Sequence, residues 1–293
     1  MDENHAAQLL TTEWGRRSAA NVALLVHGLT GRAGAFEGLV EGLVEGLDPK
    51  GGFPGGGWRF LAPDLRGRGA SREITSGEGG IPEHARDLLA LLDREGLERV
   101  VFVGHSLGAM IGVYIAAEHP ERLSGLVLVD GGADVTDEVY ELTLPAVERL
   151  GRSYPSREAY VEHVKGFPFF EDRWDEQLER YFADDVYRED GEWRPLADPV
   201  SARRDQEKLP GFPLSERHPQ IRCPTLVLLS TVGLLGPDEG YILPPQEARR
   251  MKQVIPDCDL VEVEDTNHYD VLYSAPKTTV QAVGAFLARL GGR

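Results

Sequence analysis

The residues best placed to do chemistry lie in Gly104-His105-Ser106-Leu107-Gly108, which has the form G-x-S-x-G. The stretch follows a run of β-formers, RVVFVG, and precedes an apolar helical pattern. A serine on a sharp strand-to-helix turn projects its hydroxyl above the sheet edge, and the flanking glycines avoid collision with the neighbouring strand and helix. The pattern predicts that Ser106 is a nucleophile.

A nucleophilic serine needs donors for the oxyanion that its attack creates. The helix expected to start at Leu107 would direct its free N–H groups and positive dipole end at the site. We therefore expect the backbone N–H of Leu107 to be one donor. A second donor should come from a loop after an earlier strand, and the segment His27–Gly31 follows the strand pattern NVALLV.

The serine also needs a base, and we expect a histidine on the loop after the last strand. The segment DLVEVEDTNHYDVL offers only His268 for this role. The strand pattern ends near Asp265, so His268 falls on the exit loop.

Three motifs occur in order: H-G-x-x-G at His27–Gly31, D-L-R-G-R-G-A-S at Asp64–Ser71, and G-H-S-L-G. Together they resemble the α/β-hydrolase superfamily, and the resemblance covers nearly the whole chain outside residues 131–219. It implies that the backbone N–H of Leu29 is the second oxyanion donor, and that the nucleophile precedes the base in the chain. His27 would hold the loop by hydrogen bonds.

The histidine needs a carboxylate that holds its tautomer and stabilises the imidazolium. In most hydrolases that the chain resembles, this acid follows the strand before the last. Here no carboxylate follows PTLVLL until Asp238. Asp130 ends the earlier strand pattern GLVLVD, a position from which a minority of the superfamily takes its acid. Among them are lactonases of the zearalenone-cleaving type, which use a glutamate there. We favour Asp130 as the acid, with Asp238 as the alternative; Asp130 is also a good residue to begin a D-G-G turn.

Apolar strand patterns alternate with helical ones along the chain, which predicts the α/β-hydrolase fold, a mostly parallel sheet with helices on both faces. A Gly- and Pro-rich turn is expected at 48–57. The alternation stops after Asp130 and resumes with PTLVLLS. We therefore expect residues 1–130 and 220–293 to form the core and residues 131–219 to form an inserted helical cap.

The cap is rich in aromatic residues, and a helical cap over the sheet edge would bring some of them above Ser106. We expect an apolar pocket, to which the loop after PTLVLL also contributes. The residues expected to line it are Gly28, Phe167, Phe169, Trp174, Leu234 and Leu235.

Composition limits the partners. The net charge is −17, from 31 basic and 48 acidic residues, which disfavours a nucleic-acid partner. No apolar run is long enough to span a membrane and no signal peptide is evident, so a cytoplasmic location is expected. The two cysteines, Cys223 and Cys258, are expected to be buried free thiols. No metal motif or cofactor fingerprint is visible, and we expect neither a metal nor a cofactor.

The leading interpretation is a serine hydrolase that cleaves a small, neutral, moderately hydrophobic carboxylic ester or lactone through an acyl-enzyme intermediate. A nucleophilic serine argues against dehalogenase and epoxide-hydrolase chemistry, which uses an aspartyl intermediate. The alternatives are a C–C bond hydrolase, a cofactor-free haloperoxidase, or a ligand receptor with no catalysis. The sequence leaves open whether the chain is a homodimer.

Overall fold

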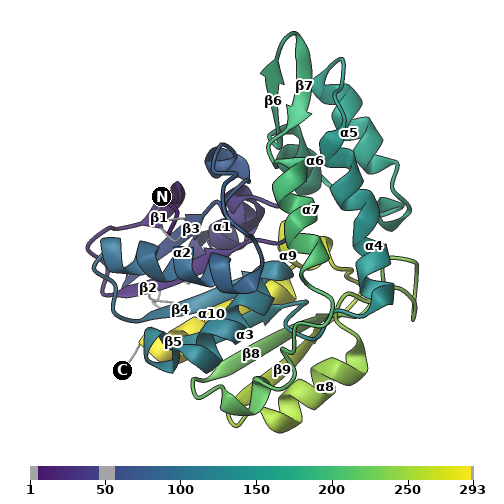
Figure 1. Ribbon diagram of the computed structural model, residues 1–293. Coiled ribbons are helices and arrows are strands. Elements are labelled where there is room, and N and C mark those ends of the chain that lie inside the picture. The colour runs from purple at the N-terminus through teal and green to yellow at the C-terminus, as the bar shows by residue number, and fades with distance from the viewer. Residues whose placement is uncertain (1–5, 46–56, 292–293) are drawn as a thin grey trace.

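The computed structural model describes residues 6–45 and 57–291 (Figure 1). Its centre is a seven-stranded sheet in the order β1-β3-β2-β4-β5-β8-β9, in which only β1 runs antiparallel to its neighbour. The strands are β1 (Thr11–Gly15), β2 (Asn21–Val26), β3 (Trp58–Pro63), β4 (Val100–His105), β5 (Leu123–Val129), β8 (Thr225–Ser230) and β9 (Cys258–Val263). The Gly- and Pro-rich turn expected at 48–57 lies, apart from Gly57, outside the described residues.

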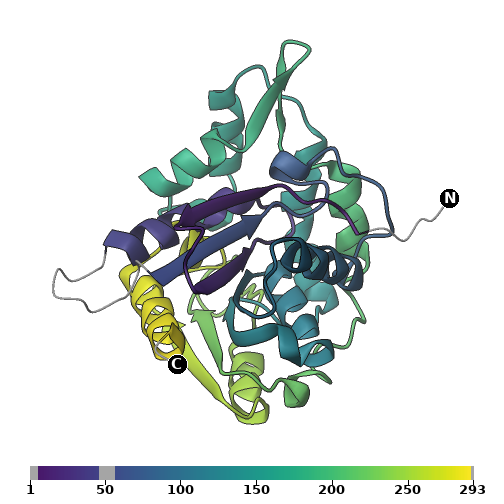
Figure 2. The same cartoon turned by 90° about the vertical axis from the view of Figure 1, so that its left-hand side faces the viewer.

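Helices cover both faces of the sheet. They are α1 (Glu37–Glu45), α2 (Ile81–Arg94), α3 (Leu107–Glu118), α8 (Pro245–Val254), α9 (Asp270–Tyr273) and α10 (Lys277–Gly291). Short 3-10 helices occupy Ala33–Phe36, Gly69–Ser71, Pro120–Arg122, Arg149–Gly151, Pro168–Phe170 and His218–Gln220. Figure 2 shows α10, in yellow, on the opposite side of the sheet from α2 and α3.

Successive strand residues point to opposite faces, so alternate residues of β2 enter different cores. Leu24 packs into the core under α2, α3 and α8, while Leu25 packs into the core under α1 and α10. A strand buried on both faces has no polar side, which is why its sequence is a continuous apolar run. The expected α/β-hydrolase fold is confirmed.

The cap lies between β5 and β8 and stands above the sheet (Figure 1). Its helices are α4 (Asp137–Glu148), α5 (Arg157–Lys165), α6 (Glu176–Ala183) and α7 (Pro199–Glu207). The cap also contains an antiparallel hairpin of β6 (Val186–Glu189) and β7 (Glu192–Pro195), which the expectation of a helical cap did not include. Asp190 and Gly191 form its two-residue turn with positive φ angles of 49° and 89°, and Asp-Gly is a strong signal for such a turn.

The described residues contain no helix with the length and apolar character that crossing a membrane requires. Both cysteines are buried and free. Burial raises the pKa of each thiol to about 11.

Candidate active site

Ser106 lies on the sharp turn between β4 and α3, with φ 56° and ψ −118°. This backbone conformation is costly for a residue with a side chain, and such strain gathers at functional sites. A Cβ on Gly104 would collide with the backbone of Gly108, and a Cβ on Gly108 would collide with the carbonyl of Val26. The two glycines thus allow the strand and the helix to meet tightly enough for this turn.

Asp130 and His268 are hydrogen-bonded to each other. Nδ1 of His268 donates to Oδ2 of Asp130 at 2.7 Å, and Asp130 is fully buried. The backbone N–H and hydroxyl of Ser230 donate to the other carboxylate oxygen at 3.1 and 2.6 Å. A proton held on Nδ1 leaves Nε2 of His268 as a proton acceptor, which is the tautomer that a general base requires.

Asp238 lies elsewhere. It occupies an exposed turn with φ 66°, whereas Nδ1 of His268 already has its carboxylate partner. Of the two carboxylates that the sequence left open, only Asp130 has the contact expected of an orienting acid.

His105 supports the loop that carries His268. Its Nε2 donates to the backbone carbonyl of His268 at 2.8 Å, and the two imidazole rings stack with centroids 4.6 Å apart. Burial lowers the pKa of His105 well below its usual value, and the nearby His268 lowers it further. His105 is therefore neutral and does not compete with His268 as a cation.

His27 holds the loop of residues 28–31, which we call the oxyanion loop, from inside the core. Its Nδ1 donates to the carbonyl of Gly28 at 2.8 Å, and its Nε2 accepts from the N–H of Leu65 at 3.0 Å. Burial lowers the pKa of His27 to about 3. Both ring nitrogens are used in these bonds, which matches the structural role expected from the resemblance.

The oxyanion loop lies directly against the nucleophile. A Cβ added to Gly28 would stand 3.1 Å from Cβ and 3.5 Å from Oγ of Ser106. The backbone N–H groups of Leu29 and Leu107 form no hydrogen bond within the part of the chain that the structure describes. Both predicted donors are therefore available to a bound oxyanion.

A buried ionic network ties this loop to the cap. Nε of Arg68 donates to the carbonyl of Leu29 at 2.9 Å, and Nη1 of Arg68 lies 2.6 Å from Oδ2 of Asp205 on α7. Asp205 also contacts Nε2 of His84 at 2.9 Å. Burial alone would raise the pKa of Asp205, but the charge of Arg68 and the contact with His84 hold it well below its usual range. The carboxylate therefore stays ionised beside Arg68.

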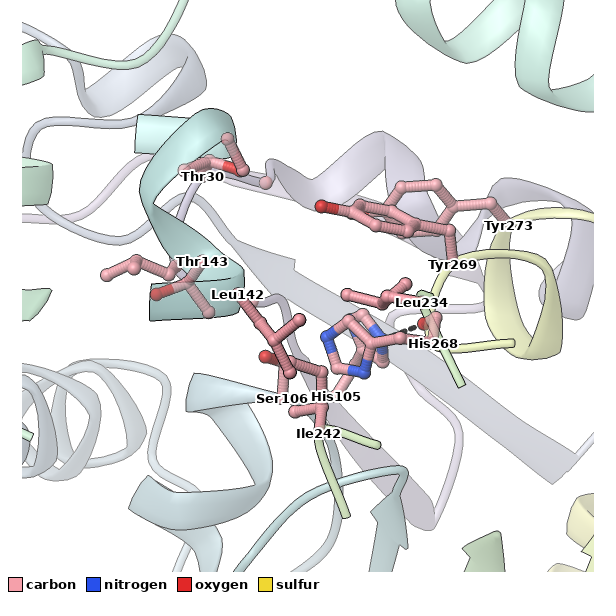
Figure 3. A pocket seen from close by; sticks show the side chains of 14 residues that line it. Thr30, His105, Ser106, Leu142, Thr143, Leu234, Ile242, His268, Tyr269 and Tyr273 are labelled. Atoms are coloured by element: carbon pink, nitrogen blue, oxygen red, sulfur yellow. Dashed lines mark hydrogen bonds between the residues drawn. The ribbon is translucent and has the colours of Figure 1, made fainter. Parts of the chain in front are cut away.

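Two hollows meet at Ser106, and we name them by their lining. The histidine arm is bounded by the oxyanion loop, cap residues, His268 and two tyrosines (Figure 3). Its lining includes Gly28, Thr30, His105, Leu142, Thr143, Ala146, Leu234, His268, Tyr269 and Tyr273. The apolar arm is lined by Leu107, Met110, Val135, Val139, Tyr140, Gln206 and Leu209. Both arms share Leu29, Ser106, Thr143 and Ile242.

Four of the residues expected to line the pocket do not line either arm. Leu235 is 58% exposed, whereas the preceding Leu234 is buried. Phe167 stacks on Phe169, which stacks on Tyr269 with centroids 5.0 Å apart. Trp174 packs against Phe170 and Phe182. Phe167 and Trp174 thus pack within the cap, and Phe169 packs between the cap and Tyr269 of the core. Of the expected set, only Gly28 and Leu234 line the hollows.

The aromatic residues that do line the histidine arm lie next to the base. Tyr269 and Tyr273 are four residues apart at α9, which places them on one face of the helix. Figure 3 shows both rings across the hollow from Leu142 and Thr143 of the cap. The spacing H-Y-x-x-x-Y was a usable signal for these two tyrosines, which the expected pocket lining did not include.

Groups of histidine, cysteine and carboxylate side chains suited to hold a metal ion do not occur among the described residues. Arg66 and Arg68, on the loop after β3, are paired with buried carboxylates. Arg66 pairs with Asp87 at 2.7 Å and with Glu83 at 3.0 Å. Ser106 and His268 are the side chains at the hollows that could act on a substrate, with Asp130 bonded to His268.

Comparison with known proteins identifies the family. A family model described as "alpha/beta hydrolase fold" matches residues 21–275. A protein of Caulobacter sp. (strain K31) named "Putative carbamate hydrolase RutD" is 26% identical over 234 residues, which cover 79% of this chain and 81% of the relative.

Solved structures share the fold. E-2-(acetamidomethylene)succinate hydrolase is 22% identical with a TM-score of 0.79, covering 95% of this chain and 94% of that chain. The enol-lactonase from Burkholderia xenovorans LB400 is 21% identical with a TM-score of 0.70, covering 97% and 96%. The family match over most of the chain shows that the protein belongs to the alpha/beta hydrolase fold family and is a hydrolase.

Proposed function

We propose that this protein is a serine hydrolase of small, neutral carboxylic esters or lactones. The observation that carries the proposal is the 2.7 Å hydrogen bond from His268 to a buried Asp130, beside a cavity that Ser106 and His268 line together. Such a pair prepares an imidazole to accept a serine proton.

In the proposed reaction, Nε2 of His268 takes the proton of Ser106 as its Oγ attacks the substrate carbonyl. The resulting oxyanion accepts hydrogen bonds from the N–H groups of Leu29 and Leu107. His268 then gives the proton to the leaving alcohol, and an acyl-Ser106 ester remains. Water, activated by His268, releases the acid and restores the serine.

The two arms receive different parts of the substrate. The leaving alcohol must reach His268 to be protonated, so it belongs in the histidine arm. The acyl chain then enters the apolar arm, between α3 and the cap. Arg66 and Arg68 lie nearby, but each is paired with a buried carboxylate. Because neither is available to bind an anionic substrate, the site favours a neutral one.

Carbamates are a second substrate class to examine, because the relative from Caulobacter carries that name. A carbamate carbonyl would be attacked by Ser106 in the same way as an ester. C–C bond hydrolysis and haloperoxidase chemistry use the same three side chains. A ligand receptor without catalysis has less support. A missing carboxylate partner for His268 would favour it, whereas Asp130 is hydrogen-bonded to His268.

The test is hydrolysis of a panel by the wild type and by Ser106→Ala. The panel holds p-nitrophenyl esters of short and medium chains, simple lactones, an aromatic macrolactone and one aryl carbamate. We expect ester or lactone turnover that Ser106→Ala abolishes, and labelling of Ser106 by an organophosphonate. A folded wild type that neither turns over the panel nor is labelled would contradict the proposal.

A further inference from the structure

A glutamine buried in the apolar arm has an amide oxygen without a partner. Gln206, on cap helix α7, is fully buried and lines the arm beside Ser106. Its Oε1 accepts no hydrogen bond within the described residues. An unpaired polar atom in a buried site costs free energy, and a hydrogen-bond donor on a bound substrate would remove that cost.

The orientation of the Gln206 amide follows from its neighbour on α4. The hydroxyl of Thr143 donates to the carbonyl of Tyr140 at 2.8 Å, and Nε2 of Gln206 donates to the same hydroxyl at 2.7 Å. A hydroxyl has one proton, and Thr143 has used it on Tyr140. Thr143 therefore accepts from Nε2, and Oε1 is left as the acceptor.

The surroundings make this acceptor selective. The rest of the apolar arm is formed largely by aliphatic side chains, including Met110, Val139 and Leu209. Thr143 lines both arms, on the cap side of the cavity (Figure 3). An acyl chain in this arm would thus meet apolar walls and an acceptor that needs a donor.

We propose that Gln206, oriented by Thr143, selects substrates whose acyl part carries a hydrogen-bond donor, with a hydroxyl group as the simplest case. This inference rests on the proposed ester hydrolysis and adds the substrate class. A hydroxyacyl ester satisfies Oε1, whereas an unsubstituted chain buries it unpaired. Sites built to bond a substrate hydroxyl discriminate strongly against analogues without one.

The probes are methyl esters of hexanoic acid, of hydroxyhexanoic acids with the hydroxyl at different carbons, and of the matching methyl ethers, which cannot donate. For the wild type we expect kcat/KM for the best hydroxy ester to exceed that for the plain ester by roughly tenfold. The matching ether should lose this advantage. A wild type with no preference for a hydroxyl at any carbon overturns the inference.

Variants locate the preference in Gln206. Gln206→Leu keeps a similar volume without the acceptor and should bring the ratio of the two kcat/KM values to one or below. Thr143→Val removes the group that orients the amide and should weaken the preference, whereas Thr143→Ser keeps the hydroxyl and should retain it. If Gln206→Leu fails to fold, the Thr143 pair decides the question.

The inference and the proposed function fail in different ways. Absence of both ester turnover and phosphonate labelling would overturn the proposed function. Turnover of plain and hydroxy esters with a ratio that survives in Gln206→Leu and in Thr143→Val would overturn this inference alone.

Discussion

Asp130 and His268 are 138 residues apart in the sequence, and their side chains meet at 2.7 Å. Asp130 follows β5, and His268 follows β9, with β8 between the two strands in the sheet. Ser230, the last residue of β8, donates its hydroxyl to Asp130 at 2.6 Å. Asp130, which we propose as the acid that orients His268, is thus supported by the end of the neighbouring strand β8.

Asp130→Asn should lower kcat by about 10⁴-fold, because an amide cannot hold the imidazole proton on Nδ1 or stabilise the imidazolium. The fold should persist, because the amide oxygen can still accept from Ser230. Steady-state kinetics on the best ester, with circular dichroism, checks this. Asp238→Asn is the control, and its kcat should stay near that of the wild type. A large loss of kcat in Asp238→Asn but not in Asp130→Asn would assign the role of orienting acid to Asp238 instead.

Gly108→Ala should destabilise the protein by about 3 kcal/mol, because the added methyl group collides with the carbonyl of Val26 in a packed core. The matched control is Gly151→Ala, where no heavy atom lies within 4 Å of the added Cβ and the change should stay within about 0.5 kcal/mol. Urea unfolding measures both. Equal stability of the two variants would be incompatible with the tight turn at Ser106.

Asp205→Asn should lower both the stability and kcat. It leaves Arg68 buried without its anionic partner, which costs about 3–5 kcal/mol. Because Arg68 holds the carbonyl of Leu29, we also expect kcat to fall roughly tenfold. This is less than the loss expected when an oxyanion donor is removed, because the N–H of Leu29 is displaced but still present. The control is Glu207→Gln, an exposed position on the same helix. A folded Asp205→Asn with wild-type kcat would show that the cap does not support the oxyanion loop.

The protein should lose stability as the pH falls from about 6.5 to 5. Burial lowers the pKa of His27 to about 3, whereas an unfolded histidine has a pKa of about 6.5. The stability that this depressed pKa provides is fully present above pH 6.5. Below pH 6.5 only the unfolded chain takes up the proton, so the free energy of unfolding declines by about 1.4 kcal/mol per pH unit.

Urea unfolding at several pH values measures that slope. His27→Gln should lower the slope of the free energy of unfolding against pH by the contribution of about one proton. This holds whatever the effect of the substitution on stability at neutral pH. His119→Gln, at a partly exposed position after α3, is the control and should leave the slope as it is. An unchanged slope in His27→Gln would show that His27 does not carry the effect.

Much of the site follows from short-range sequence patterns. The strand before Ser106, the flanking glycines and the helix after it report a tight turn, because each residue acts on its immediate neighbours. The Asp-Gly of the cap hairpin carried the same kind of local signal. His268 was identifiable because it is the only histidine in its segment.

Only the tertiary structure decided which distant groups meet. Asp130 and Asp238 both follow apolar stretches, and the path of β5 beside β8 brings Asp130 rather than Asp238 to His268. We expected aromatic residues of the cap to line the pocket. The type of a side chain indicates that it prefers burial, but it does not indicate which surface buries it. The contacts of Gln206 with Thr143 and of Asp205 with Arg68 cross from one element to another. The sequence by itself determined the fold and the chemical groups, whereas packing between distant segments determined how those groups are paired, since hydrophobic burial has no direction of its own.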